Sequence, residues 1–144
     1  MELLLGFWFI LFFVPAAFED IKKQSLDLRL LLFFALPLPF LIFVTGGNIV
    51  SFSRMFGLGM GLVLYGLSVL SRGAIGRGDA LVVMWLGYGI GVLALTEVLC
   101  LAWAGTFVLA AIMSLAKKKR PIPFLPFLGT AYYVFFAGLL VGGA

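Results

Sequence analysis

The chain has 144 residues, of which 64% are hydrophobic and only 11% are charged, and its mean hydropathy is +1.22. A water-soluble domain needs a more polar surface, so the composition excludes that class and indicates an integral membrane protein. The net charge of +4 comes from short basic clusters between apolar runs, which fits anchors on an anionic membrane surface and not a nucleic-acid interface.

Six apolar stretches approach the length of about 20 residues that an α-helix needs to cross the hydrocarbon core. In chain order they cover residues 3–18, 28–45, 51–70, 80–95, 98–116 and 124–142. We therefore expect an all-α polytopic membrane protein, a bundle of about six transmembrane helices that forms one domain over residues 1–144. A tight turn near Thr96 and Glu97 is expected to separate the fourth and fifth helices.

Proline and glycine predict two local features of these helices. Pro37 and Pro39 lie within the second stretch, where they must kink or break the helix, because proline has no backbone N–H. Gly57 and Gly61 are four residues apart in the third stretch, a spacing that lets two helices approach closely. We interpret these glycines as packing residues of the bundle.

The basic residues predict the orientation of the chain. Arg54 is the one basic residue that a topology with both termini outside the cell membrane does not place at the cytoplasmic face. The others all fall at that face: Lys22, Lys23, Arg29, Arg72, Arg77, Lys117, Lys118, Lys119 and Arg120. Because positively charged loops stay in the cytoplasm, we expect this orientation in the cell membrane.

The residue types that usually bind metals or cofactors are scarce. Cys100 is the single cysteine of the chain, and histidine is absent. A zinc or haem site of the usual kind is therefore not expected, and neither is any other metal or cofactor.

Two aspartates carry the chemical signal. Asp20 ends the first stretch and Asp79 begins the fourth, so the expected topology places both at the cytoplasmic boundary. Two carboxyl groups held close together in a partly dehydrated site do not both ionise, so one can serve as acid while the other activates water. Gly76 and Gly78 precede Asp79 in a G-x-G-D pattern, and would allow a tight turn and the close approach of an extended substrate.

The other acids have simpler explanations, and a simpler explanation of the pair also stays open. Asp27 directly precedes the second stretch, where a helix N-terminus favours a negative group. Asp20 and Asp79 could likewise be two interfacial residues that only cap helices. The basic neighbours Lys22, Lys23 and Arg77 could favour the ionised form of either carboxyl.

Three stretches resemble the type IV prepilin peptidases, membrane aspartic proteases of the G-x-G-D type. They are FEDIKKQSL with the first aspartate, GRGDALVVMWLGYGIG with the second, and KKKRPIPFLPFLG before the last helix. The resemblance implies that Asp20 and Asp79 are the catalytic pair and that Gly76 and Gly78 are the motif glycines. It also implies cleavage of the basic leader of prepilin-like proteins at the cytoplasmic face, without a cofactor.

The chain departs from this family in two places. Many members have an Ile-Pro pair followed by Asn or Asp after the first aspartate, whereas the corresponding positions here are Leu26 and Asp27. Larger members carry a domain with paired Cys-x-x-Cys motifs that is associated with N-methylation, and a chain with one cysteine lacks those motifs. We therefore expect a short form that acts as a peptidase only.

Two other classes of protein remain as alternatives. A small transporter or channel could bind a cation or a proton at its interfacial aspartates, although no acid lies midway through any expected span. A pilus assembly factor without catalytic activity could hold pilin-like helices by packing alone. In each case the expected partners are membrane lipids and, for the peptidase and the assembly factor, prepilin-like proteins.

Overall fold

The computed structural model describes residues 2–23, 26–72, 76–117 and 122–142. Within these ranges the chain is helical, with no strand. The helices are α1 (Glu2–Lys23), α2 (Leu28–Ala35), α3 (Leu38–Val44), α4 (Phe52–Leu70), α5 (Arg77–Ile90), α6 (Val92–Leu115) and α7 (Leu125–Gly142). The expected all-α bundle is therefore confirmed. The basic residues Lys118, Lys119 and Arg120 lie outside the described residues.

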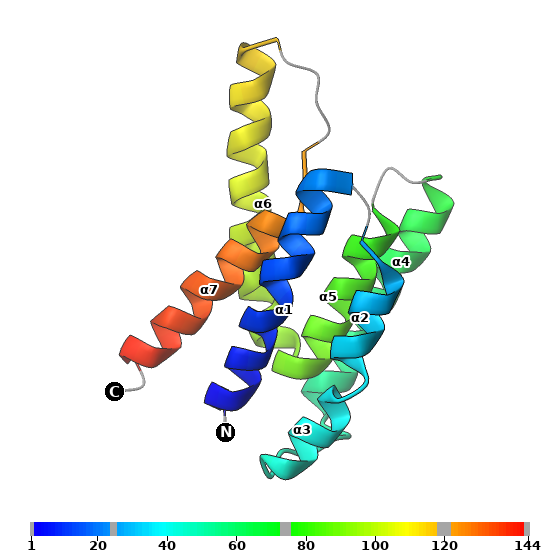
Figure 1. The fold of residues 1–144 in the computed structure, drawn as a ribbon, viewed down its shortest axis with the longest axis vertical. Coiled ribbons are helices and arrows are strands. Elements are labelled where there is room, and N and C mark those ends of the chain that lie inside the picture. The colour runs from blue at the N-terminus through cyan, green and yellow to red at the C-terminus, as the bar shows by residue number, and fades with distance from the viewer. Residues whose placement is uncertain (1, 24–25, 73–75, 118–121, 143–144) are drawn as a thin grey trace.

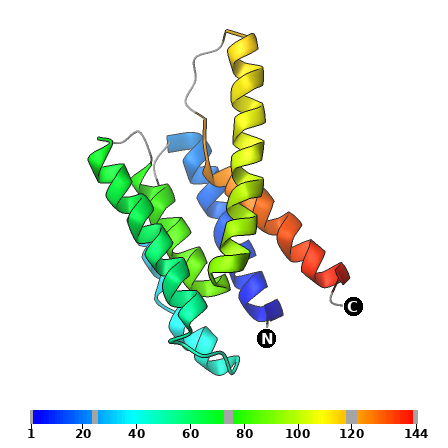
Figure 2. The same cartoon turned by 180° about the vertical axis from the view of Figure 1, so that it is seen from behind.

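The helices run up and down between two ends of the bundle (Figures 1 and 2). Both chain termini and α3 lie at one end, which we call the terminal end. The last turns of α1 and α4 and the first turns of α2, α5 and α7 lie at the other end, which we call the loop end, and the C-terminal part of α6 projects beyond it. The C-terminal end of α1, which carries Asp20, therefore lies at the same end of the bundle as the first turn of α5, which carries Asp79.

Four helices are long and apolar enough to cross a membrane by length and composition: α1 from Leu3 to Lys23, α4, α6 and α7. The chain is accordingly a membrane protein built from apolar helices. The remaining expected spans differ from the prediction, because α5 has only 14 residues and the stretch 28–45 is divided into α2 and α3.

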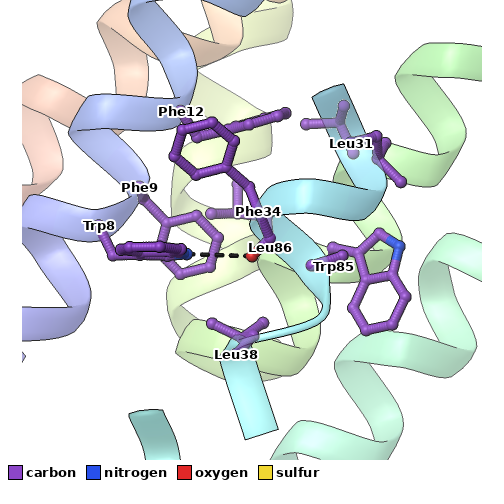
Figure 3. A pocket seen from close by; sticks show the side chains of 10 residues that line it. Trp8, Phe9, Phe12, Leu31, Phe34, Leu38, Trp85 and Leu86 are labelled. Atoms are coloured by element: carbon purple, nitrogen blue, oxygen red, sulfur yellow. Dashed lines mark hydrogen bonds between the residues drawn. The ribbon is translucent and has the colours of Figure 1, made fainter. Parts of the chain in front are cut away.

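The division between α2 and α3 confirms the break that the prolines predict. Pro37 stands at the N-terminal cap of α3 and has no N–H to continue the ladder of α2. The interruption frees the carbonyl of Phe34, which accepts a hydrogen bond of 3.0 Å from the indole Nε1 of Trp8 on α1 (Figure 3). A side chain of another helix thus satisfies the backbone group that the break exposes.

The boundary between α5 and α6 lies five residues before the expected turn, so the prediction of a turn near Thr96 and Glu97 is wrong. The chain turns at Gly91, whose φ of 86° is in a region that residues with a Cβ rarely adopt. Thr96 lies inside α6, where its hydroxyl donates to the Val92 carbonyl over 2.8 Å. Ser53 on α4 stabilises the turn, because its Oγ accepts the Val92 N–H over 3.1 Å.

Close packing of α4 on α5 confirms the packing role of Gly57 and Gly61. A Cβ at Gly57 would collide with the backbone of Gly87, and a Cβ at Gly61 would collide with the backbone of Met84. The two helices therefore approach until their main chains touch, which side chains at these positions would prevent.

Aromatic rings hold α1 against α7. The ring of Tyr132 lies 5.6 Å from the ring of Phe9 and 5.6 Å from the ring of Phe13, measured between centroids, and Tyr132 stacks on Phe136. Tyr132 and Phe13 are almost completely buried. This packing fixes the N-terminal turn of α7 beside the C-terminal turns of α1.

Replacing Trp8 by Phe should lower the free energy of unfolding by about 1–3 kcal/mol, because the partly buried carbonyl of Phe34 would lose its donor. The measurement is the unfolding midpoint in mixed micelles with increasing SDS content. Trp103 is half exposed and its indole N–H has no described hydrogen bond, so Trp103→Phe is the matched control. Equal effects of the two substitutions would contradict the role given to the indole N–H.

Replacing Gly57 by Ala should also destabilise the fold, by about 1–3 kcal/mol, because the added methyl group forces α4 and α5 apart. Gly59 on the same helix has no atom within 4 Å of the position of its Cβ, so Gly59→Ala should leave the unfolding midpoint unchanged or slightly raise it. The same unfolding assay compares the two variants. A stable Gly57→Ala variant would show that the contact between the two main chains contributes little.

Candidate active site

Asp20 is a buried acid at the loop end of α1. Its side chain is only 8% exposed, and its Oδ2 accepts a hydrogen bond of 3.2 Å from the backbone N–H of Leu125. The two residues are 105 positions apart in the sequence. The contact therefore joins the first helix of the chain to the last.

The N–H of Leu125 is available because Leu125 is the first residue of α7. The first N–H groups of a helix have no partner within the helix, and the next residue, Pro126, has none to offer. The N-terminus of a helix also carries a partial positive charge, which stabilises a nearby carboxylate. Asp20 thus acts as a cap for α7 although it belongs to another helix.

Asp79 lies in the first turn of α5, with Gly76 as the N-terminal cap of that helix. Its carboxyl group turns back over Gly76, so that a Cβ at position 76 would lie 2.6 Å from Asp79 Oδ2. Any residue other than glycine at position 76 would displace the carboxyl group. The first glycine of the G-x-G-D pattern therefore makes room for the aspartate of the same pattern.

Gly78 makes room for the segment between α1 and α2. A Cβ at Gly78 would lie 3.0 Å from the Cβ of Leu26, so this segment rests directly on the first turn of α5. The expected contact of these glycines with a substrate stays a prediction. What the described structure adds is that both glycines are already needed for contacts within the chain.

The segment between α1 and α2 is tied down at both of its described ends. Asp27 Oδ1 accepts the N–H of Arg29 over 3.1 Å, which confirms Asp27 as the N-terminal cap of α2. The N–H of Asp27 in turn donates to Oε2 of Glu19 over 3.2 Å. Glu19 precedes Asp20 on α1, so these bonds hold the residue next to Leu26 against the end of α1.

The two aspartates interact electrostatically. Burial, and to a smaller extent repulsion by Asp20, together raise the pKa of the Asp79 carboxyl to about 7. The basic residues Lys22, Lys23 and Arg77 are all exposed, and the expectation that they favour the ionised form does not hold for Asp79. Near neutral pH the protonated and ionised forms of Asp79 are therefore both populated.

The structure thus brings all four predicted site residues to the loop end, together with two that sequence reasoning missed. Leu125 supplies a backbone donor, and Leu26 packs on the glycine turn. A backbone N–H leaves no mark on residue type, although Pro123 and Pro126 indicate that a helix begins between them. Among the described residues no three His, Cys, Asp or Glu side chains gather into a group that could hold a metal ion.

This arrangement can carry out acid–base chemistry. A carboxyl group with a pKa near 7 can donate a proton, and the neighbouring Asp20, in its ionised form, can accept one. Because the two groups influence each other, they titrate as a pair.

The raised pKa of Asp79 predicts a pH-dependent stability. The Asp79 carboxyl binds its proton more tightly in the folded state than in the unfolded state, where its pKa has the ordinary value of 3.8. The free energy of unfolding therefore falls as the pH rises from about 4 to about 7. Asp79→Asn removes this loss and should be more stable than the wild type at pH 8, by up to about 4 kcal/mol, but not at pH 4. Unfolding in mixed micelles across this pH range measures the difference. Parallel curves for the two proteins would contradict the assignment.

Comparison of the chain with models of protein families, with curated proteins and with solved structures finds no match. The likeness to the prepilin peptidases therefore rests on the sequence motifs quoted above. The function has to be argued from the two aspartates and the groups that surround them.

Proposed function

We propose that this protein is an aspartic endopeptidase of the membrane boundary, which removes the basic leader peptide from prepilin-like proteins. The observation that carries the proposal is the electrostatic interaction of Asp20 with Asp79, two acids from different helices at one end of an apolar bundle. Structural acids of a membrane protein are usually kept apart or paired with a cation, because a second buried carboxyl makes each charge more costly. A catalytic pair is a reason to hold them together.

The contacts around the pair support separate roles for the two acids. Asp20, which accepts the N–H of Leu125, is suited to be the base, and Asp79, whose pKa is about 7, is suited to be the acid. Asp20 takes a proton from a water molecule while the water oxygen bonds to the carbonyl carbon of the scissile peptide. Asp79 then gives its proton to the amide nitrogen, and the C–N bond breaks to leave a carboxylic acid and an amine.

The membrane setting supports the choice of substrate. The loop end carries the described basic residues Lys22, Lys23, Arg72 and Lys117, which by the rule for positive loops would face the cytoplasm of a cell membrane. A prepilin has a basic leader followed by an apolar helix, so its scissile bond lies where hydrocarbon gives way to water. Asp20 lies near the C-terminal end of α1 and Asp79 in the first turn of α5, which fits a bond presented where the helices meet the loops.

Replacing Asp20 or Asp79 by Asn should abolish leader cleavage, with a loss of at least about a thousandfold, because neither proton transfer has a substitute. The assay follows cleavage of a co-expressed prepilin in membranes at matched protein levels. Asp27→Asn is the matched control, because asparagine caps a helix as well as aspartate does and Asp27 is exposed. The control should cleave at the wild-type rate.

Four results would contradict the proposal. Cleavage by either Asn variant at the wild-type rate would remove that aspartate from the mechanism. An inactive wild type, tested against several prepilins, would favour the transporter or the assembly factor. Loss of ion flux in the two variants would identify the transporter, and an unchanged phenotype would identify the assembly factor.

A further inference from the structure

A second feature lies at the opposite end of the bundle from the aspartates. A cavity of about 270 Å³ opens between α1, α7 and the α4–α6 group. Its wall is apolar except for one cation, Arg54, in the first turn of α4. Along α1, the distance from Gly6 in the cavity wall to Asp20 is about 21 Å, so the cavity is separate from the candidate active site.

Only part of the hydrogen-bonding capacity of Arg54 is used inside the protein. Its Nη1 donates to the carbonyl of Gly89 over 2.6 Å and to the carbonyl of Tyr88 over 3.3 Å, at the C-terminal end of α5. Among the described residues, every buried side-chain nitrogen has a hydrogen-bond partner. Nε and Nη2 of Arg54 have no described hydrogen bond, so they are not buried. These two nitrogens are therefore accessible to a ligand.

The charge of Arg54 also has no counter-ion within the described part of the chain, where its hydrogen-bond acceptors are two backbone carbonyls. A guanidinium beside apolar side chains is unfavourable unless an anion accompanies it. The free Nε and Nη2 form the fork that binds two oxygens of one phosphate or carboxylate. The surrounding bilayer supplies such a group together with an apolar tail.

We propose that this cavity is a binding site for an anionic phospholipid. The phosphate binds Nε and Nη2 of Arg54, and part of an acyl chain fills the apolar space. One face of α7 lines that space with Tyr132, Phe135, Phe136 and Leu139, which recur at helical spacing. A peptide helix would need roughly 1,200 Å³ for each 15 Å of its length, so the cavity suits a lipid chain better than a second helix.

The test is native mass spectrometry of the full chain in neutral detergent, with phosphatidylglycerol or phosphatidylcholine added at equal concentration. The wild type should bind the anionic lipid about tenfold more tightly, since both lipids carry a phosphate but in phosphatidylcholine the choline cation neutralises its charge. Arg54→Gln should reduce this preference to below about twofold. Arg54 also holds the end of α5, so Arg54→Gln could act by disturbing the fold, and a second variant is needed. Ala94→Leu fills the cavity but leaves the guanidinium in place, and it should weaken binding of the anionic lipid.

Arg72→Gln is the matched control, because Arg72 is an exposed cation at the loop end. It should keep the preference for phosphatidylglycerol. The proposal would be overturned if both Arg54→Gln and Ala94→Leu kept the preference for phosphatidylglycerol. It would also be overturned if Arg72→Gln lost this preference, because the basic loops would then be the lipid-binding surface. Loss of leader cleavage in Ala94→Leu with lipid binding unchanged would assign the cavity to the substrate instead. The lipid readout does not depend on peptidase activity, so the failure of either proposal leaves the other standing.

Discussion

Backbone groups that a helix break exposes cannot be left unpaired in an apolar surrounding, and this constraint organises the whole bundle. At four described interruptions or helix ends, the partner is a side chain from a different helix. The four contacts are Trp8 to the Phe34 carbonyl, Ser53 to the Val92 N–H, Arg54 to the carbonyls of Tyr88 and Gly89, and Asp20 to the Leu125 N–H. Polar side chains are rare in this chain, and these four serve as connections between helices.

Asp20 combines that structural task with the proposed chemistry. Its Oδ2 is engaged by α7, and its charge acts on Asp79 at the start of α5. Asparagine at position 20 keeps an oxygen that can accept the Leu125 N–H but has no charge and cannot take up a proton. The substitution Asp20→Asn therefore separates the structural contribution of this residue from its contribution to the chemistry.

The sequence predicts the parts of the structure that depend on residue type and local order. Apolar runs predict the helices, Pro37 predicts the break between α2 and α3, and Asp27 predicts the cap of α2. The turn at Gly91 is missed because several glycines of that run could turn equally well, and the contact with Ser53 on α4 is what favours this one. The role of Leu125 is missed because the atom that matters belongs to the backbone.

The bond between Asp20 and Leu125 also has a consequence for biosynthesis. Asp20 leaves the ribosome early, whereas its donor is made 105 residues later, which at usual rates of translation takes about 5–20 s. During that interval the Asp20 carboxyl lacks the hydrogen bond from the N-terminus of α7. Asp20 gains this donor only when α7 has been made, so a helix synthesised long after α1 completes the contact.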